Sequence, residues 1–118
     1  MIFDDIVLKW GGVEYTIKSD EVMGAIARVE EIVTLQELAS YVQTGKTPMS
    51  KLAMAFGSVL RYAGATVKDQ EVYAGMFEQD GQNNAVMSLS TLLSMMIPQT
   101  VSKKSGNEQA EPTVGNNS

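Results

Sequence analysis

The segment Pro48–Gly64, PMSKLAMAFGSVLRYAG, carries the clearest helical pattern in the chain. Its apolar residues recur at the i, i+3, i+4 and i+7 spacing of one helix face, at Met49, Leu52, Ala53, Phe56, Val59, Leu60 and Ala63. Thr47 is the expected N-cap, Pro48 suits the first helical position, and Gly64 suits a left-handed C-cap. We therefore predict a central helix over residues 48–63, against which shorter elements pack.

A β-hairpin is predicted over residues 5–18, before this helix. Two runs that alternate apolar and polar residues flank the pair Gly11–Gly12, which is typical of a two-residue hairpin turn. The residues expected on its buried side are Ile6, Leu8, Trp10, Val13, Tyr15 and Ile17. Because a two-stranded ribbon is marginally stable alone, it must lie on the helices, add strands from another subunit, or both.

Two helices are predicted between the hairpin and the central helix, over residues 20–33 and 34–44. Ser19 is the expected cap of the first helix. Thr34 and Glu37 have the spacing of a capping box, so a second helix is expected to begin there. The expected inner faces are Val22, Ile26, Val29 and Val33 in the first helix, and Leu35, Leu38, Ala39 and Val42 in the second.

A fourth helix is predicted over residues 67–79, after the central one. Thr66 and Asp69 repeat the capping-box spacing, and Asp80–Gly81 is expected to stop the helix. The fold class that these elements predict is α+β and mainly α, with an N-terminal hairpin followed by about five short helices.

A fifth helix is predicted over residues 83–97, opened by Asn83 or Asn84. Beyond it the composition changes, because residues 99–118 are rich in Ser, Asn, Gly and Glu and hold two valines as their only large apolar residues. Such a segment cannot bury enough surface to offset its ordering entropy. We therefore predict a single globular domain over residues 1–98 and a disordered polar tail.

Composition excludes several classes of function. The 118 residues carry a net charge of −5, which argues against a nucleic-acid binder and against an anionic membrane surface as partner. No apolar run reaches the roughly 20 residues of a membrane span, and the N-terminus lacks the basic region of a signal peptide. The absence of cysteine and histidine removes the thiolate and imidazole groups on which most catalytic and metal sites depend.

Motifs for chemistry are also missing. The tripeptide Gly45–Thr47 lacks the upstream glycine of a phosphate-binding loop and is interpreted as a link between helices. The adjacent acid pairs Asp4–Asp5, Asp20–Glu21 and Glu30–Glu31 are interpreted as solvated surface, since neighbours in a helix do not share a face. We predict no catalytic, cofactor-binding or metal-binding residues, and an enzyme is the least favoured class.

The chain is instead rich in side chains that suit interfaces. Eight methionines and four tyrosines give more adaptable apolar and aromatic groups than a core of this size is expected to hide. The residues predicted to bind a partner are Tyr41, Met49, Tyr62, Met54, Tyr73, Met76, Met87 and Met95. Self-association through the edge of the hairpin is a further expectation, because an unpaired edge invites another strand.

Several of these stretches resemble one family of proteins. The hairpin has the form W-G-G-x-x-Y-x-I from Trp10, and the central helix ends in Leu60–Gly64, Leu-Arg-Tyr-Ala-Gly. A short helix led by Thr66 and an Asp80–Gly81 stop follow. Over residues 7–98 this resembles the tail assembly chaperones of long-tailed bacteriophages and the related gene-transfer-agent tail protein.

The resemblance implies a non-enzymatic role with no catalytic residues or cofactors. Members of this family coat the long helical tape measure protein before the tail tube polymerises around it. They act in the host cytoplasm and are not expected in the mature virion. Many occur in two lengths, the longer made by a ribosomal frameshift, and a polar tail is consistent with a linker to such an extension.

Three other functions remain open from the sequence. A head–tail connector or tail completion protein would form a ring of fixed stoichiometry and stay in the particle. A small regulatory domain that binds nucleic acid is opposed by the net charge of −5. An enzyme would have to rely on carboxylates or lysine alone.

Overall fold

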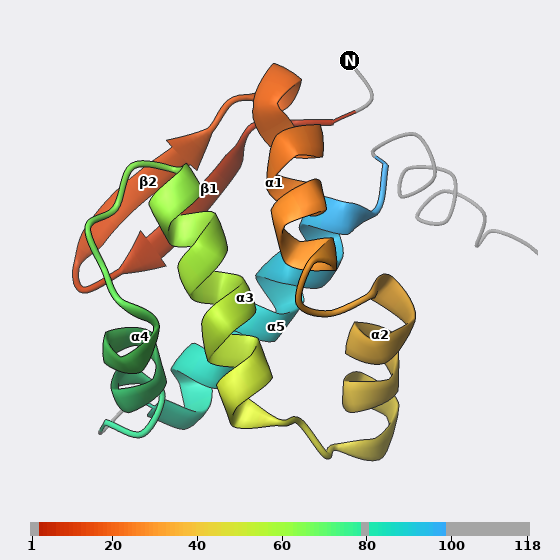
Figure 1. The fold of residues 1–118 in the computed structure, drawn as a ribbon, viewed down its shortest axis with the longest axis vertical. Helices are drawn as coiled ribbons and strands as arrows, with labels where there is room; N and C mark the ends of the chain where they lie inside the picture. Colours follow the sequence, from red (N-terminus) through yellow and green to blue (C-terminus); the bar gives the residue numbers. More distant parts are fainter. Residues whose placement is uncertain (1–2, 79–80, 99–118) are drawn as a thin grey trace, which may run out of the picture.

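A computed structural model describes residues 3–78 and 81–98 and confirms the α+β, mainly α class (Figure 1). The predicted tail, residues 99–118, lies outside the described residues. In chain order the elements are β1 (Ile6–Trp10), β2 (Val13–Ile17), a 3₁₀ turn (Ser19–Glu21), α1 (Val22–Glu30), α2 (Leu35–Thr44), α3 (Met49–Tyr62), α4 (Asp69–Gly75) and α5 (Gly81–Met96).

Helix α3 lies at the centre of the described fold, as predicted. It contacts α1, α4 and α5, and Figure 1 shows it in front of α5 with the hairpin and α4 to one side. Its buried residues are Leu52, Ala53, Ala55, Phe56, Gly57, Val59 and Leu60. The stripe read from the sequence is confirmed, and Ala55 and Gly57 widen it because neighbours cover α3 on more than one side.

The two ends of α3 differ in how well they were predicted. The N-cap is Pro48 in extended backbone, not Thr47, so the helix begins one residue later than expected. At the other end Gly64 adopts a φ of +108°, a conformation that favours glycine. The Gly64 N–H donates to the Arg61 carbonyl at 3.0 Å and the Ala65 N–H donates to the Leu60 carbonyl at 2.9 Å. This pair of bonds is a Schellman motif, which turns the chain sharply toward α4.

The N-terminal hairpin is confirmed, with Trp10 opposite Val13 across the Gly11–Gly12 turn. Both glycines have positive φ, as a type I′ turn requires. Leu8 and Ile17 are buried at 1% exposure. The expectation that Val13 is buried is wrong, because this residue sits at the tip of the ribbon, beyond the helices, and is exposed.

Helix α1 is shorter than the predicted range 20–33. Residues Ser19–Glu21 form a 3₁₀ turn before it, and the α-helix ends at Glu30. Ser19 makes no side-chain cap; its backbone N–H instead donates to Asp5 Oδ1 at 2.8 Å, which ties the helix entry to the start of the hairpin. The predicted inner stripe is confirmed, since Val22, Ile26, Val29 and Val33 are all buried.

Helix α2 begins at the predicted capping box. The Thr34 N–H donates to Glu37 Oε1 at 2.8 Å, and the Glu37 N–H donates to Thr34 Oγ1 at 3.1 Å. Its inner face was only partly predicted, because Leu38 is buried but Val42 is 57% exposed and Ala39 is also exposed. Tyr41 takes their place against the core, since α2 is rotated so that its Leu38–Tyr41 edge faces the other helices.

The predicted ends of α4 and α5 need correction. Helix α4 covers Asp69–Gly75 rather than residues 67–79, and Glu71, not Asp69, closes its first turn by accepting the Lys68 N–H at 2.7 Å. Gly81 does not stop a helix but is the first residue of α5. Asn84 lies inside α5, where its side chain donates to the carbonyl of Gly75 at 3.1 Å, so it holds α4 instead of opening α5.

Glu37 makes the stability of the α2 capping box pH-dependent. The bond from the Thr34 backbone N–H, aided by Lys51, holds the pKa of Glu37 below its ordinary value of 4.5. The ionised carboxylate therefore stabilises the fold above pH 4.5, and this contribution is lost as the pH falls through the lowered pKa.

We predict that wild-type protein is more stable than Glu37→Gln near neutral pH and that the two converge as the pH falls below 4.5. Urea unfolding followed by circular dichroism across this range measures the difference. Thr34→Ala serves as the control. It removes the hydroxyl but keeps the backbone donor. The hydroxyl is the smallest of the groups that lower the pKa of Glu37, so its loss should cost about 1 kcal/mol with much less dependence on pH. A wild-type advantage that stays the same at every pH below 4.5 at which the protein is folded would contradict the prediction.

Candidate functional site

The residues predicted to bind a partner fall into three groups by exposure. Met54, Tyr73 and Met87 are exposed, at 38%, 43% and 51%. Tyr41, Met49 and Tyr62 are partly buried and pack against the core. Met76 and Met95 lie within the core at 2% and 0% exposure, so the structure removes them from the surface. Both occupy inward positions where an unbranched side chain fills space between helices.

Tyr62 joins elements within the fold. Its hydroxyl donates to the Glu21 carbonyl at 3.1 Å, and the guanidinium of Arg28 lies 5.2 Å from the centre of its ring. A Cβ at Gly24 would overlap the Tyr62 hydroxyl, so this glycine lets the ring approach α1. These contacts give Tyr62 a structural role at the α1–α3 junction.

Met54, Tyr73 and Phe77 form an exposed apolar surface, which we call the α3–α4 patch. The rings of Tyr73 and Phe77 lie 5.0 Å apart between centroids and are tilted by 55°. Phe77 is 59% exposed and was not among the predicted partner-binding residues. Phe77 falls inside the predicted helix over residues 67–79. The periodicity gave no sign that α4 ends at Gly75, so the sequence did not indicate that the Phe77 side chain is exposed.

A shallow hollow of about 370 Å³ adjoins this patch. Its lining residues are Ser50, Ala53, Met54, Asp69, Gln70 and Tyr73. Asp69 is held there by an ion pair with Arg61, with Oδ1 2.8 Å from Nη1. A Cβ at Gly57 would lie 2.6 Å from the same oxygen, so the missing side chain leaves room for the pair. The hollow is therefore a mainly apolar surface with a fixed polar margin.

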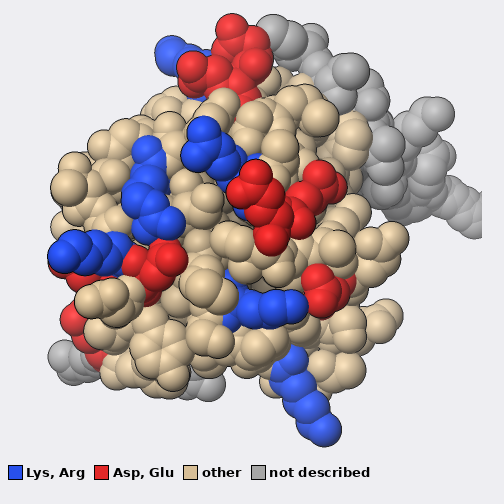
Figure 2. All heavy atoms as spheres, viewed as in Figure 1, with Lys and Arg blue, Asp and Glu red and all other residues tan. Residues whose placement is uncertain are grey.

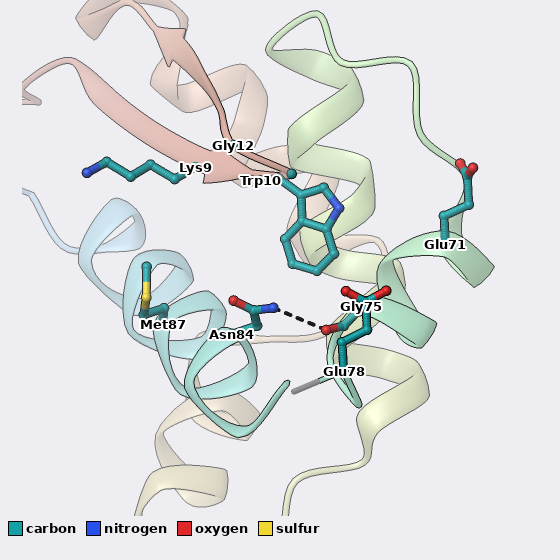
Figure 3. A pocket seen from close by; sticks show the side chains of 9 residues that line it. Lys9, Trp10, Gly12, Glu71, Gly75, Glu78, Asn84 and Met87 are labelled. Atoms are coloured by element: carbon teal, nitrogen blue, oxygen red, sulfur yellow. Dashed lines mark hydrogen bonds between the residues drawn. The ribbon is translucent and has the colours of Figure 1, made fainter. Parts of the chain in front are cut away.

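A second hollow, of about 560 Å³, lies beneath the tip of the hairpin (Figure 3). Its lining residues are Lys9, Trp10, Gly11, Gly12, Glu71, Gly75, Glu78, Asn84 and Met87. The Trp10 ring lies against Gly75, where a Cβ would come within 2.5 Å of Cζ2, and 5.8 Å from the ring of Phe56. The indole therefore fastens the hairpin to α3 and α4.

The charged groups around this second hollow lie on different sides of it. Figure 3 shows Lys9 and Glu71 pointing away from the indole on either side, while Glu78 points toward the indole from below. Lys9 pairs with Glu14 at 3.7 Å, and Glu71 accepts the Lys68 backbone N–H. Among the side chains that the structure describes, no three acids lie close enough together to hold a metal ion.

Comparisons with family models, with curated proteins and with solved structures found no match to this chain. Within residues 3–78 and 81–98, no helix has both the length and the hydropathy that crossing a bilayer requires. On the face shown in Figure 2, basic and acidic side chains are interspersed among uncharged ones. This face therefore gives no support to binding of a phosphate backbone, which needs a concentrated basic surface.

We predict that Gly75→Ala destabilises the protein through Trp10. The added methyl would lie 2.5 Å from the indole, and overpacking of this kind costs about 1–3 kcal/mol. The better helix propensity of alanine offsets at most about 1 kcal/mol of that. Denaturant unfolding with Trp fluorescence and circular dichroism measures the change.

A double-mutant cycle with Trp10→Phe tests whether the indole is responsible. The smaller ring leaves space for the methyl, so the double variant should lose less stability than the sum of the two single variants. Additive losses would show that Gly75→Ala acts through the backbone of α4 and not through Trp10.

Proposed function

We propose that this protein is a tail assembly chaperone of a long-tailed phage or prophage, and that it binds the tape measure protein during tail morphogenesis. The observation that carries the proposal is the α3–α4 patch, where Met54, Tyr73 and Phe77 expose apolar surface beside a hollow of about 370 Å³. A soluble domain keeps such a surface for a binding partner more often than for its own stability.

The shape of the patch suits an amphipathic helix. Both helices line the shallow hollow, α3 with Met54 and α4 with Tyr73. A helix that presents apolar residues at i, i+3, i+4 and i+7 can lay that stripe across such a surface. Methionine adapts to different side chains, which a protein that covers many turns of a long client requires.

The resemblance described above supplies the identity of the client. In that family the client is the tape measure protein, whose length exceeds that of any one chaperone. Many copies binding along one chain would hold it through multivalency, while each contact stays weak enough to release as the tube closes. On this proposal the protein acts in the host cytoplasm and leaves before the particle is complete.

We predict that Tyr73→Ala and Phe77→Ala each weaken binding of the tape measure protein about 10- to 100-fold, and that Met54→Ala weakens it less. Because all three side chains are exposed, each change should cost no more than about 1.5 kcal/mol of stability, with the loss of the Tyr73–Phe77 ring contact included. Calorimetric titration of the full chain with the purified client measures affinity. Met23→Ala and Val42→Ala are matched controls, since both remove exposed apolar groups elsewhere.

Two results would overturn the proposal. One is a lack of complex between wild-type protein and the client. The other is an equal loss of affinity in the controls. Mass spectrometry of purified particles separates the chaperone from a head–tail connector or tail completion protein, because only the structural component stays in the virion.

A further inference from the structure

We infer that β1 pairs antiparallel with β1 of a second copy of this chain, with Val7 opposite Val7 of the partner. The two hairpins would then form one continuous four-stranded sheet. This inference does not depend on the identity of the client, because it rests on the edge of β1 and the groove beside it.

The first observation is the open edge of β1. In a two-residue hairpin the residues that flank the turn form a hydrogen-bonded pair, and bonded and non-bonded pairs then alternate. The register therefore directs the backbones of Leu8 and Ile6 toward β2, and those of Val7 and Lys9 outward. Among the described residues the sheet contains β1 and β2 only, so these outward groups are available to another strand.

The second observation is a groove that follows this edge along its whole length. Three adjoining hollows separate β1 from α5, and neighbouring hollows share Lys9, Trp10 and Met87 at one junction and Val7 and Thr91 at the other. Figure 3 shows the end of this space that lies at the hairpin tip, with Lys9 on the strand and Met87 on the helix. The helix side is built largely from short side chains, namely Asn84, Ser88, Ser90, Thr91 and Ser94. These leave room for an incoming backbone.

The third observation selects a second copy as the occupant. Only the register centred on Val7 places Asp5 of each chain opposite Lys9 of the other, so two ion pairs form at once. Centring on Lys9 would oppose two lysines, and centring on Asp5 would oppose two aspartates, both of which are unfavourable. Val7 itself is 51% exposed and would gain a β-branched neighbour across the new pair.

The same register agrees with the backbone. Asp5, Val7 and Lys9 are alternate residues, so all three direct their N–H and C=O groups to the open side. Asp5 keeps one carboxylate oxygen for the Ser19 N–H and has a second for the partner's Lys9. A two-stranded ribbon, which is marginal alone, would become the centre of a wider sheet.

Charge reversal tests the register. Lys9→Asp gives a chain with acids at both positions, and Asp5→Lys gives a chain with two lysines. Each should self-associate at least about tenfold more weakly than wild type, whereas an equimolar mixture should dimerise because every acid then faces a lysine. Sedimentation velocity of the full chain over a range of concentrations measures this, with circular dichroism to confirm that each variant is folded.

The absence of native cysteine allows a second test by cross-linking. In the proposed dimer two copies of residue 7 face each other within disulfide range, so Val7→Cys should oxidise rapidly to a covalent dimer. Thr16→Cys, at the cross-strand position on β2, is the matched control and should cross-link at least tenfold more slowly. A wild-type chain that stays monomeric at all concentrations, equal cross-linking at both positions, or folded charge variants that fail to pair when mixed would each overturn the inference.

Discussion

Burial of α3 on several sides at once is the constraint on which the rest of the described structure depends. Its small residues set the distances: Ala53 and Ala55 are buried, and Gly57 leaves space for Asp69. Larger side chains at Leu52 and Phe56 then fill the spaces between α1, α4 and α5. A fully buried leucine or phenylalanine contributes about 1.5–3 kcal/mol, so a few such residues stabilise much of a small domain.

With α3 buried in this way, apolar side chains of the α3–α4 patch and of the β1 edge remain exposed on the surface. Helix α4 lies between the two candidate binding regions. Its Tyr73 belongs to the α3–α4 patch, and its Gly75 contacts the Trp10 ring near the β1 edge. A client on the patch and a second copy at the hairpin would therefore occupy different sides of the same short helix. Self-association would then place two patches on one client, which increases their combined affinity without stronger individual contacts.

The sequence predicted best where local chemistry alone decides the outcome. The Thr34–Glu37 capping box, the Gly11–Gly12 turn and the end of α3 at Gly64 each depend on neighbouring residues. The predictions of helix caps failed where a group from another element intervenes. Asn84 does not cap α5, because its side chain donates to the Gly75 carbonyl. Asp69 does not cap α4, because it pairs with Arg61, and Glu71 accepts the Lys68 N–H instead. Exposure of methionine could not be predicted either, because Met76 and Met87 differ only in what packs over them.

The position of Trp10 has a spectroscopic consequence. It is the one tryptophan in the chain, and its indole lies between Phe56, Gly75 and the groove along α5. Detachment of the hairpin would move this ring from an apolar contact into water and shift its emission to longer wavelength. Intrinsic fluorescence of the unmodified protein therefore reports on the contact between the hairpin and the helices. Far-ultraviolet circular dichroism records the helical content separately.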